Sequence, residues 1–260
     1  MSSTSNPLVL LLRKLEAHST LDEDDRRAIL ALPSTLKALD AQAYLVREGD
    51  APGACAVVAS GFACRHKQTA DGARQIVALH IPGDPLDLQG LFLDVADHSV
   101  QMLTRAELAM IPRTILQGLI RARPGVGRAF LVLTLVEDSI LREWVLNIGR
   151  RGAAARLAPF RCARGGRLEA QGLAGGDGYE LPMTQEQLGD ALGLTPVHVN
   201  RTLRVLESLG FVERQRRRVR IADWRRMRDY GDFNPRYLHL GRTRAGVSPS
   251  APVESAFRAR

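Results

Sequence analysis

Residues 184–208 read TQEQLGDALGLTPVHVNRTLRVLES, and this stretch decides the fold of the C-terminal third of the chain. Thr184 and Gln187 have the spacing of a capping box, in which two side chains close the N-terminus of a helix. Thr195 caps a second helix with Pro196 at its first position, where a missing backbone N–H costs nothing. The stretch therefore predicts two short helices joined by a tight turn, which is the helix-turn-helix arrangement.

The second of these helices has an inward and an outward side. Its apolar residues recur at intervals of four and three and must face a core; they are Val199, Leu203 and Leu206. The outward side chains suit a major groove, because Arg bonds guanine and Asn bonds adenine with two hydrogen bonds, while Val fits a thymine methyl. We expect base contacts from Val197, His198, Asn200 and Arg201. We expect phosphate contacts from Thr184, Thr195 and Arg204.

A basic hairpin follows the second helix. Segment 211–221 places apolar residues and arginines in two short runs, as the wing of a winged helix does. Cationic side chains on a wing contact DNA phosphates, and the candidates are Arg216, Arg217 and Arg218. An exposed basic hairpin with no nucleic-acid partner is the alternative interpretation.

The positive charge is concentrated at this end of the chain. Residues 181–260 hold 15 Lys and Arg against 8 Asp and Glu, so they carry +7 of the net charge of +8, whereas residues 1–180 are nearly balanced. A basic excess that coincides with the predicted helix-turn-helix favours a polyanionic partner, above all double-stranded DNA. A GC-rich genome explains the preference for Arg over Lys, but not this segregation.

The N-terminal half has a different pattern. Two short helices are predicted at 7–18 and 21–32, and Pro33 ends the second. From Ala41 to Pro112, short apolar runs alternate with Gly, Pro and Asp, which is the spacing of short strands. The expected strands contain residues 44–46, 56–58, 76–79, 100–103 and 108–111, with Asp71-Gly72 as a hairpin candidate. The pattern predicts a β-roll or jelly roll, and the whole chain belongs to the α+β class.

A long helix is predicted from Val126 to about Ile148, after Pro124 and Gly125 end the preceding helix. Because this helix is apolar around most of its circumference, it needs two burial partners. We expect one face to cover the β-domain and the other to form a dimer contact with coiled-coil-like packing. The stripe assigned to the dimer contact comprises Phe130, Leu133, Ile140 and Trp144. The alternative is a central helix within one larger core.

Breakers and composition divide the chain into five predicted segments. They are an N-terminal helical segment (1–20), a sensor-like β-roll (21–124), a dimerisation helix (125–156), a winged helix-turn-helix DNA-binding domain (157–240) and a disordered tail (241–260). The tail is rich in Arg, Ser, Pro, Ala and Gly and shows no periodicity.

Three stretches resemble the C-terminal part of CRP/FNR-type bacterial regulators. They are LPMTQ at 181–185, LGDALGLTPVHVNRTL at 188–203 and DFNPRYL at 232–238. The resemblance covers roughly residues 20 to 240 and implies a cyclic-nucleotide-binding-like β-roll, a long dimerisation helix and a winged helix. It also implies a homodimer that regulates transcription from a palindromic DNA site, with RNA polymerase as a further partner. Arg201 matches the family's base-reading arginine, whereas Val197 stands where many members have a base-reading glutamate.

The sensor end departs from the cyclic-nucleotide binders of this family. Those proteins carry a Gly-Glu pair, whose Glu holds the ribose hydroxyl, and an Arg-Ser or Arg-Thr pair, whose Arg holds the phosphate. The corresponding positions here are Asp87-Leu88 and His98-Ser99, so both polar anchors are missing. These four residues mark a candidate effector pocket that we expect not to bind cAMP. An unidentified small-molecule effector, or regulation by expression level alone, is left open.

The cysteines and histidines limit the cofactors. The three cysteines form no CxxC pair and none precedes Cys55, which excludes the N-terminal iron-sulfur cluster of oxygen-sensing relatives. Haem ligation by Cys64, His66, His80 or His98 stays open, although scattered strand residues of these types usually serve packing. We therefore expect neither a cofactor nor a metal.

Catalysis is not expected. A cupin-like metal site needs a His-x-His pair followed by Glu and a later His, and His66, His80 and His98 lack that spacing. The rival to a DNA-binding regulator is a ligand-sensing module that acts mainly through protein contacts. The apolar run from Leu8 to Leu12 is too short for a signal peptide, and no run approaches a membrane span. We expect a cytoplasmic protein without membrane contact.

Overall fold

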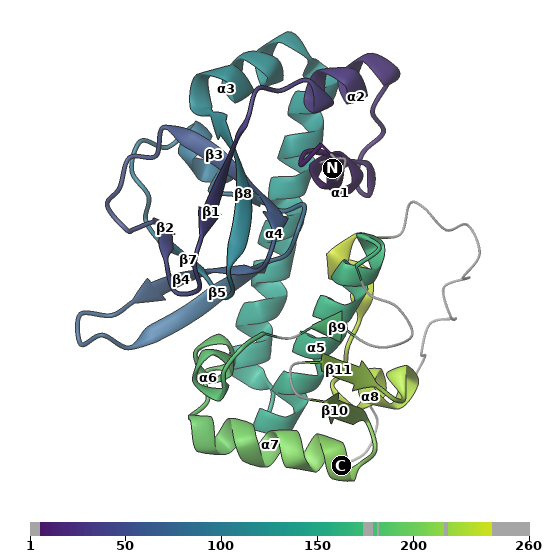
Figure 1. Ribbon diagram of the computed structural model, residues 1–260. Helices are drawn as coiled ribbons and strands as arrows, with labels where there is room; N and C mark the ends of the chain where they lie inside the picture. The colour runs from purple at the N-terminus through teal and green to yellow at the C-terminus, as the bar shows by residue number, and fades with distance from the viewer. Residues whose placement is uncertain (1–5, 174–178, 181, 216–217, 241–260) are drawn as a thin grey trace, which may run out of the picture.

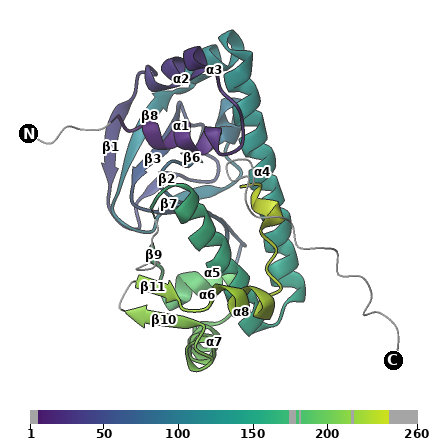
Figure 2. The ribbon, with the colours of Figure 1, turned by 90° about the vertical axis from the view of Figure 1, so that its right-hand side faces the viewer.

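The protein is described by a computed structural model that covers residues 6–173, 179–180, 182–215 and 218–240. A β-rich domain lies at one end and a second, mainly helical domain at the other, and α4 (Pro124–Arg150) runs along both (Figure 1). After α4, the helix α5 (Ala153–Ala170) folds back toward α1 (Val9–Glu16), as the view turned by 90° shows (Figure 2). The two domains therefore meet along α4 and α5.

Two antiparallel four-stranded sheets build the N-terminal domain, within residues 35–112. Their strand orders are β1-β8-β3-β6 and β2-β7-β4-β5. The strands are β1 (Thr35–Leu39), β2 (Tyr44–Val46), β3 (Ala54–Ser60), β4 (Ala63–Gln68), β5 (Arg74–His80), β6 (Pro85–Leu86), β7 (Ser99–Met102) and β8 (Ala106–Pro112). A short 3-10 helix, η1 (Leu88–Leu91), follows β6. The apolar core of the domain includes Val46, Val58, Val100, Met102 and Leu108.

The predicted β-roll is confirmed, with three strands more than the sequence indicated. Each of the five expected apolar runs lies in a strand, as β2, β3, β5, β7 and β8, except that Leu103 follows the end of β7. The hairpin at Asp71-Gly72 joins β4 to β5, and Gly72 adopts a φ of +87° that suits glycine in such a turn. The strands β1, β4 and β6 were not predicted.

Two short helices close the N-terminal side of this domain, as predicted. Asp22 caps α2 (Glu23–Leu30) by accepting a hydrogen bond from the Asp25 amide (2.7 Å). Helices α1 and α2 share one apolar core with α3 (Arg113–Ala122) and with the first half of α4. The N-terminal segment is thus part of the sensor-like domain's core.

The stripe of α4 that was predicted to form the dimer contact faces its own chain. Phe130 and Leu133 are 4% and 1% exposed and lie in the core formed with α1 and α2. Ile140 and Trp144 pack against the core of the C-terminal domain, and Trp144 Nε1 donates a hydrogen bond to the Ala191 carbonyl (2.8 Å). The assignment of Phe130 and Leu133 to the dimer contact is therefore wrong, whereas Ile140 and Trp144 are half-buried in the single chain. The apolar side chains left outside on α4 are Leu131, Leu135, Leu141, Val145 and Leu146.

The C-terminal domain combines helices with a small antiparallel sheet of order β10-β11-β9. Its elements after α5 are β9 (Tyr179–Glu180), α6 (Gln185–Leu192), α7 (Pro196–Ser208), β10 (Val212–Gln215), β11 (Arg218–Ile221), α8 (Trp224–Tyr230) and the 3-10 helix η2 (Pro235–Leu238). The long helix ends at Arg150, and a separate helix begins at Ala153, inside the predicted 125–156 segment. The tail 241–260 lies outside the described residues. Within the described ranges, no helix is long and apolar enough to span a bilayer.

Candidate nucleic-acid interface

The first helix of the pair, α6, is fixed at both ends. The Thr184 hydroxyl accepts from the Gln187 amide (3.1 Å) and the Gln187 side-chain carbonyl accepts from the Thr184 amide (2.9 Å), so the predicted capping box is present. At the other end Gly193 adopts a φ of +63°, and Arg156 of α5 donates to the carbonyls of Leu192 (3.0 Å) and Gly193 (3.2 Å). These bonds hold the turn that sets the angle of the next helix.

The second helix, α7, is anchored by its inner side. Thr195 accepts from the His198 amide (3.3 Å), and Pro196 occupies the first position as predicted. The inward residues Val199, Leu203 and Leu206 are buried in the domain core. A side chain at Gly189 would lie 2.4 Å from the Leu194 carbonyl, so the backbone of α6 approaches the turn before α7 closely. The orientation of α7 is thus determined by packing.

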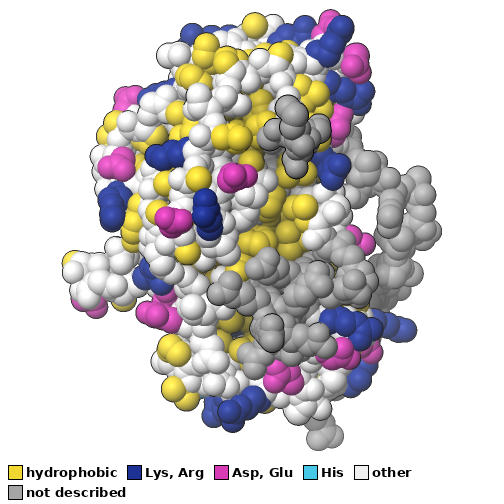
Figure 3. Space-filling view, viewed as in Figure 1, with side chains coloured by type: hydrophobic (Ala, Val, Ile, Leu, Met, Phe, Trp, Pro, Cys, Tyr) yellow, Lys and Arg dark blue, Asp and Glu magenta, His cyan; other side chains and the backbone are white. Residues whose placement is uncertain are grey.

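The outward side of α7 presents the predicted contact residues. Val197, at 78% exposure, is followed at i+4 and i+7 by the exposed Arg201 and Arg204. Neither arginine forms an ion pair with another described residue. Within the described part of the chain, both guanidinium groups are therefore free to bind a ligand. His198 is exposed, with Nδ1 3.3 Å from the Thr195 hydroxyl, and Asn200 is half-buried. The space-filling view shows basic side chains at the end of the molecule that α7 forms (Figure 3).

The wing is formed by β10 and β11, which pair in antiparallel register. Phe211 at its base packs edge-on against Tyr230, with Arg226 over the same ring. Of the predicted phosphate contacts, Arg216 and Arg217 lie outside the described residues, and the backbone of Arg218 begins β11. The wing therefore lies directly after α7 in the position that the sequence indicated.

Comparisons with known proteins match both halves of this architecture. Residues 155–230 match the model of the Crp-like helix-turn-helix domain, and residues 36–123 match that of the cyclic nucleotide-binding domain. The chain belongs to the CRP/FNR family. It is a DNA-binding transcription regulator, not an enzyme.

Individual members of the CRP/FNR family resemble the chain over most of their length. It is 29% identical to the transcriptional activator protein FnrL of Cereibacter sphaeroides, over 70% of this chain and 75% of that protein. It is 26% identical to the transcriptional activator protein anr of Pseudomonas aeruginosa, over 69% and 73% of the two chains. The structure of FixK2 from Bradyrhizobium japonicum superposes with a TM-score of 0.69 at 25% identity and covers 76% of this chain and 98% of that one.

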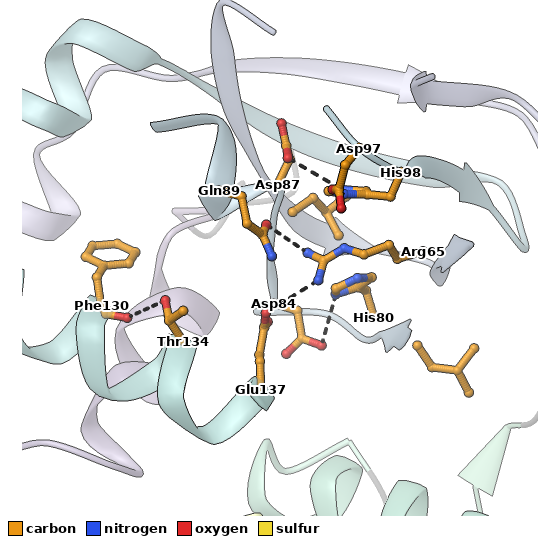
Figure 4. Close-up of polar contacts among 12 residues, drawn as sticks. Arg65, His80, Asp84, Asp87, Gln89, Asp97, His98, Phe130, Thr134 and Glu137 are labelled. Carbon is orange, nitrogen blue, oxygen red and sulfur yellow. Dashed lines mark hydrogen bonds and ion pairs between the residues drawn. The ribbon is translucent and has the colours of Figure 1, made fainter. Parts of the chain in front are cut away.

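The predicted effector-pocket residues do not form a pocket together. Leu88 lies in the apolar core beside the N-terminal helices. Asp87 has a left-handed backbone (φ 56°), is buried, and lies 3.5 Å from His98 Nε2 (Figure 4). Ser99 accepts a hydrogen bond from the Glu48 amide (3.1 Å). Of the four, His98 alone lines the large cavity of this domain, so Asp87, Leu88 and Ser99 are not part of that cavity.

The residues that do line this cavity come from separate segments and were not predicted. They include Arg65, Gln89, Glu137 and Arg167, together with His80, which had been considered only as a haem ligand. The available signal in the sequence was a charged residue inside an otherwise apolar run, as at Glu137, because such a residue on a buried helix needs a partner.

The cysteines contribute no ligand site. Cys55, Cys64 and Cys162 are all buried and free, and burial raises the pKa of each thiol to about 12. Thiolates are the metal-binding form of cysteine, so these side chains are poor ligands. Within the described ranges no group of His, Cys, Asp and Glu is arranged to hold a metal ion.

Proposed function

We propose that the protein binds a palindromic DNA operator as a homodimer, with one α7 in the major groove of each half-site. The observation that carries this proposal is the face of α7, on which Val197, Arg201 and Arg204 are exposed and neither arginine pairs with a described acidic residue, while the opposite face is fixed in the core. A rigid helix with free arginines on one side is what sequence readout in a major groove requires.

The contacts follow from the chemistry of the outward side chains. Arg201 donates two hydrogen bonds to a guanine, Asn200 bonds an adenine edge, and Val197 meets a thymine methyl. His198 stands between Val197 and Asn200, where it bonds a base edge or a phosphate. The phosphate contacts come from residues around the helix and on the wing, namely Thr184, Thr195, Arg204, Arg216, Arg217 and Arg218.

The dimer contact lies on the outward face of α4. Leu131, Leu135, Asp138, Arg142 and Val145 stand at alternating intervals of four and three residues, the spacing of a coiled-coil seam. Leu131, Leu135 and Val145 expose apolar surface, whereas Asp138 and Arg142 pair with each other within the helix. Two parallel α4 helices bury the leucines and bring the two ion pairs together, where polar residues fix the register.

The test is an unbiased selection of double-stranded oligonucleotides on the full-length protein, followed by titration of the Arg201→Ala variant. We expect a palindromic site, and a loss of about 1 to 3 kcal/mol on that site together with relaxed preference at one base pair. Arg121→Ala is the matched control, since Arg121 is exposed on α3 at the far end of the molecule (Figure 1). Absence of any enriched sequence, or equal losses on selected and random DNA, contradicts the proposal.

We also infer that the bound dimer contacts RNA polymerase and works in the cytoplasm, where the chromosome is transcribed. The support is the name "transcriptional activator" carried by FnrL and anr. Transcription in vitro from a promoter that carries the selected operator measures whether this protein raises or lowers initiation.

A further inference from the structure

One motif of the sequence has no part in the DNA contacts described above. It is DFNPRYL at 232–238, which follows α8 and includes η2. The segment 231–240, which we call the brace, runs from α8 back along α4, as its yellow ribbon shows in Figure 2. Its residues contact α4, α5 and α1, so it touches both helices on either side of the connection between the two domains.

Arg151, the first residue after α4, joins the brace to that helix. Its guanidinium donates to the Glu143 carboxylate (2.6 Å) and to the Asn147 side-chain carbonyl (3.3 Å), both on α4. The same group donates to the backbone carbonyl of Asp232 in the brace (3.0 Å). Because the Arg151 side chain is only 11% exposed, water competes little for these charge-assisted bonds. Arg151 therefore bridges α4 and the brace.

The brace also packs closely against α5. A side chain at Gly231 would place its Cβ 2.6 Å from Cδ of Pro159 on α5, so the two backbones approach each other. Phe233 and Leu238 are buried in the core of the C-terminal domain. Tyr237 and Leu238 line a cavity of about 50 Å³ together with residues of both α4 and α5. The three segments therefore meet in one place.

The conformation of the brace is itself fixed. Asn234 caps η2, since its side-chain carbonyl accepts from the Arg236 amide (3.0 Å). Asp232 and His239 hold left-handed backbones, with φ of 49° and 50°. Such conformations persist only where the surroundings impose them. The far end is attached to α1, because the His239 carbonyl lies 3.2 Å from Nδ1 of His18.

The connection between α4 and α5 gives little support of its own. It consists of Arg151 and Gly152, and a Cβ at Gly152 would meet no atom within 4 Å. Arg156 in the first turn of α5 donates to the Arg151 carbonyl (2.7 Å) and to the carbonyls of residues 192–193 (3.0 and 3.2 Å), which form the turn before α7. The angle between α4 and α5 thus determines where α7 lies relative to α4.

We propose that the brace fixes this angle, with Arg151 as a positioning residue, and thereby selects the spacing between the two half-sites of the operator. The inference rests on the proposed function, because spacing matters only when two α7 helices bind one duplex. Neighbouring base pairs are about 3.4 Å apart, so a displacement of about 1.7 Å in each protomer changes the preferred spacing by one base pair. Base preference within a half-site depends instead on the side chains of α7.

The first experiment measures the affinity of full-length protein for operators whose selected half-sites are separated by spacers up to about two base pairs shorter or longer. We expect the preference for the best spacing to fall about tenfold in Arg151→Ala and in Asn234→Ala, with base preference unchanged. Asn234→Ala releases the cap of η2 without altering charge, so it excludes lost attraction to phosphate as the cause. Arg151→Lys, which keeps the charge but not the planar bridge, should restore part of the preference.

Arg150→Ala is the matched control, because Arg150 is the exposed neighbour of Arg151 and forms no ion pair with any described residue. We expect it to keep the wild-type spacing preference. If Arg151→Ala does not fold, Asn234→Ala decides. A loss of affinity that is equal at every spacing, or an unchanged preference in the brace variants, overturns the inference.

A second measurement needs neither an operator nor a dimer. Spin labels on Arg128→Cys of α4 and Leu209→Cys at the end of α7, in chains diluted with excess unlabelled protein, report the distance between these helices within one chain. We expect a narrow distribution in the otherwise wild-type chain and a broader one with Arg151→Ala or Asn234→Ala. Equal widths overturn the inference. If no operator is selected, the proposed function fails, and this measurement still decides whether the brace fixes the angle.

Discussion

The outward face of α4 allows a quantitative test of the dimer contact through Leu135→Ala. Leu135 is 56% exposed in the single chain, so about half of its side chain is left to be buried by a partner. Full burial of a leucine contributes roughly 1.5 to 3 kcal/mol, which leaves about 1 kcal/mol for this contact. A two-fold axis counts the residue twice, so the variant loses about 2 kcal/mol of dimerisation free energy. The dimer dissociation constant is expected to rise about 30-fold.

Sedimentation velocity over a concentration series measures this shift, and thermal unfolding of the same samples reports on the fold. Leu133→Ala is the matched control, because Leu133 is two residues away on the same helix but lies in the chain's own core. We expect Leu133→Ala to destabilise each chain by about 2 to 5 kcal/mol without a specific change in dimer affinity. If Leu135→Ala leaves the dissociation constant unchanged, the seam does not follow this face and the heptad reasoning is refuted.

Two further predictions concern stability. Trp144→Phe removes the hydrogen bond to the Ala191 carbonyl and should lower the free energy of unfolding by about 1 kcal/mol in urea denaturation; an unchanged midpoint would show that this bond does not hold α6 on α4. Burial lowers the pKa of His18 to about 4, so the unfolded chain takes up its proton near pH 6.5 while the folded chain does not. Stability therefore falls by up to about 3 kcal/mol as the pH drops from 6.5 to 4. The plot of unfolding free energy against pH should be flatter for His18→Gln than for the wild type by that amount. If the two plots run parallel, other groups cause the acid sensitivity.

The fold was largely predictable because its breakers and periodicities are local. Pro33, Pro124, Gly193 and Pro196 lie at or near the ends of helices, where their backbone preferences act directly. The strand β1 was missed because its residues are mostly exposed and show no alternation of buried and exposed positions. The strand β6 was missed because a strand of two residues is too short to show a periodicity. These strands are specified by pairing with β8 and β3, which is a tertiary effect.

The DNA interface and the cavity differ in how much of each could be predicted from the sequence. The capping residues, the turn and the outward arginines all lie within residues 184–204. The candidate DNA interface could therefore be located from local spacing in the sequence. The faces of α4 could not be distinguished, because a helix apolar all round has no single preferred side, and Phe130 and Leu131 look equivalent in sequence. The cavity brings Arg65, Glu137 and Arg167 together from three elements, a meeting that only tertiary structure defines.

The three buried thiols provide the protein with natural reporters of motion. Cys55 lies in the N-terminal core, whereas Cys64 on β4 and Cys162 on α5 lie in the core that joins the two domains. A thiol reagent can modify each of them only when its surroundings open, so the modification rate measures the free energy of local opening. Without any introduced label, the chain can therefore show whether its sensor-like half and its DNA-binding half loosen together or independently.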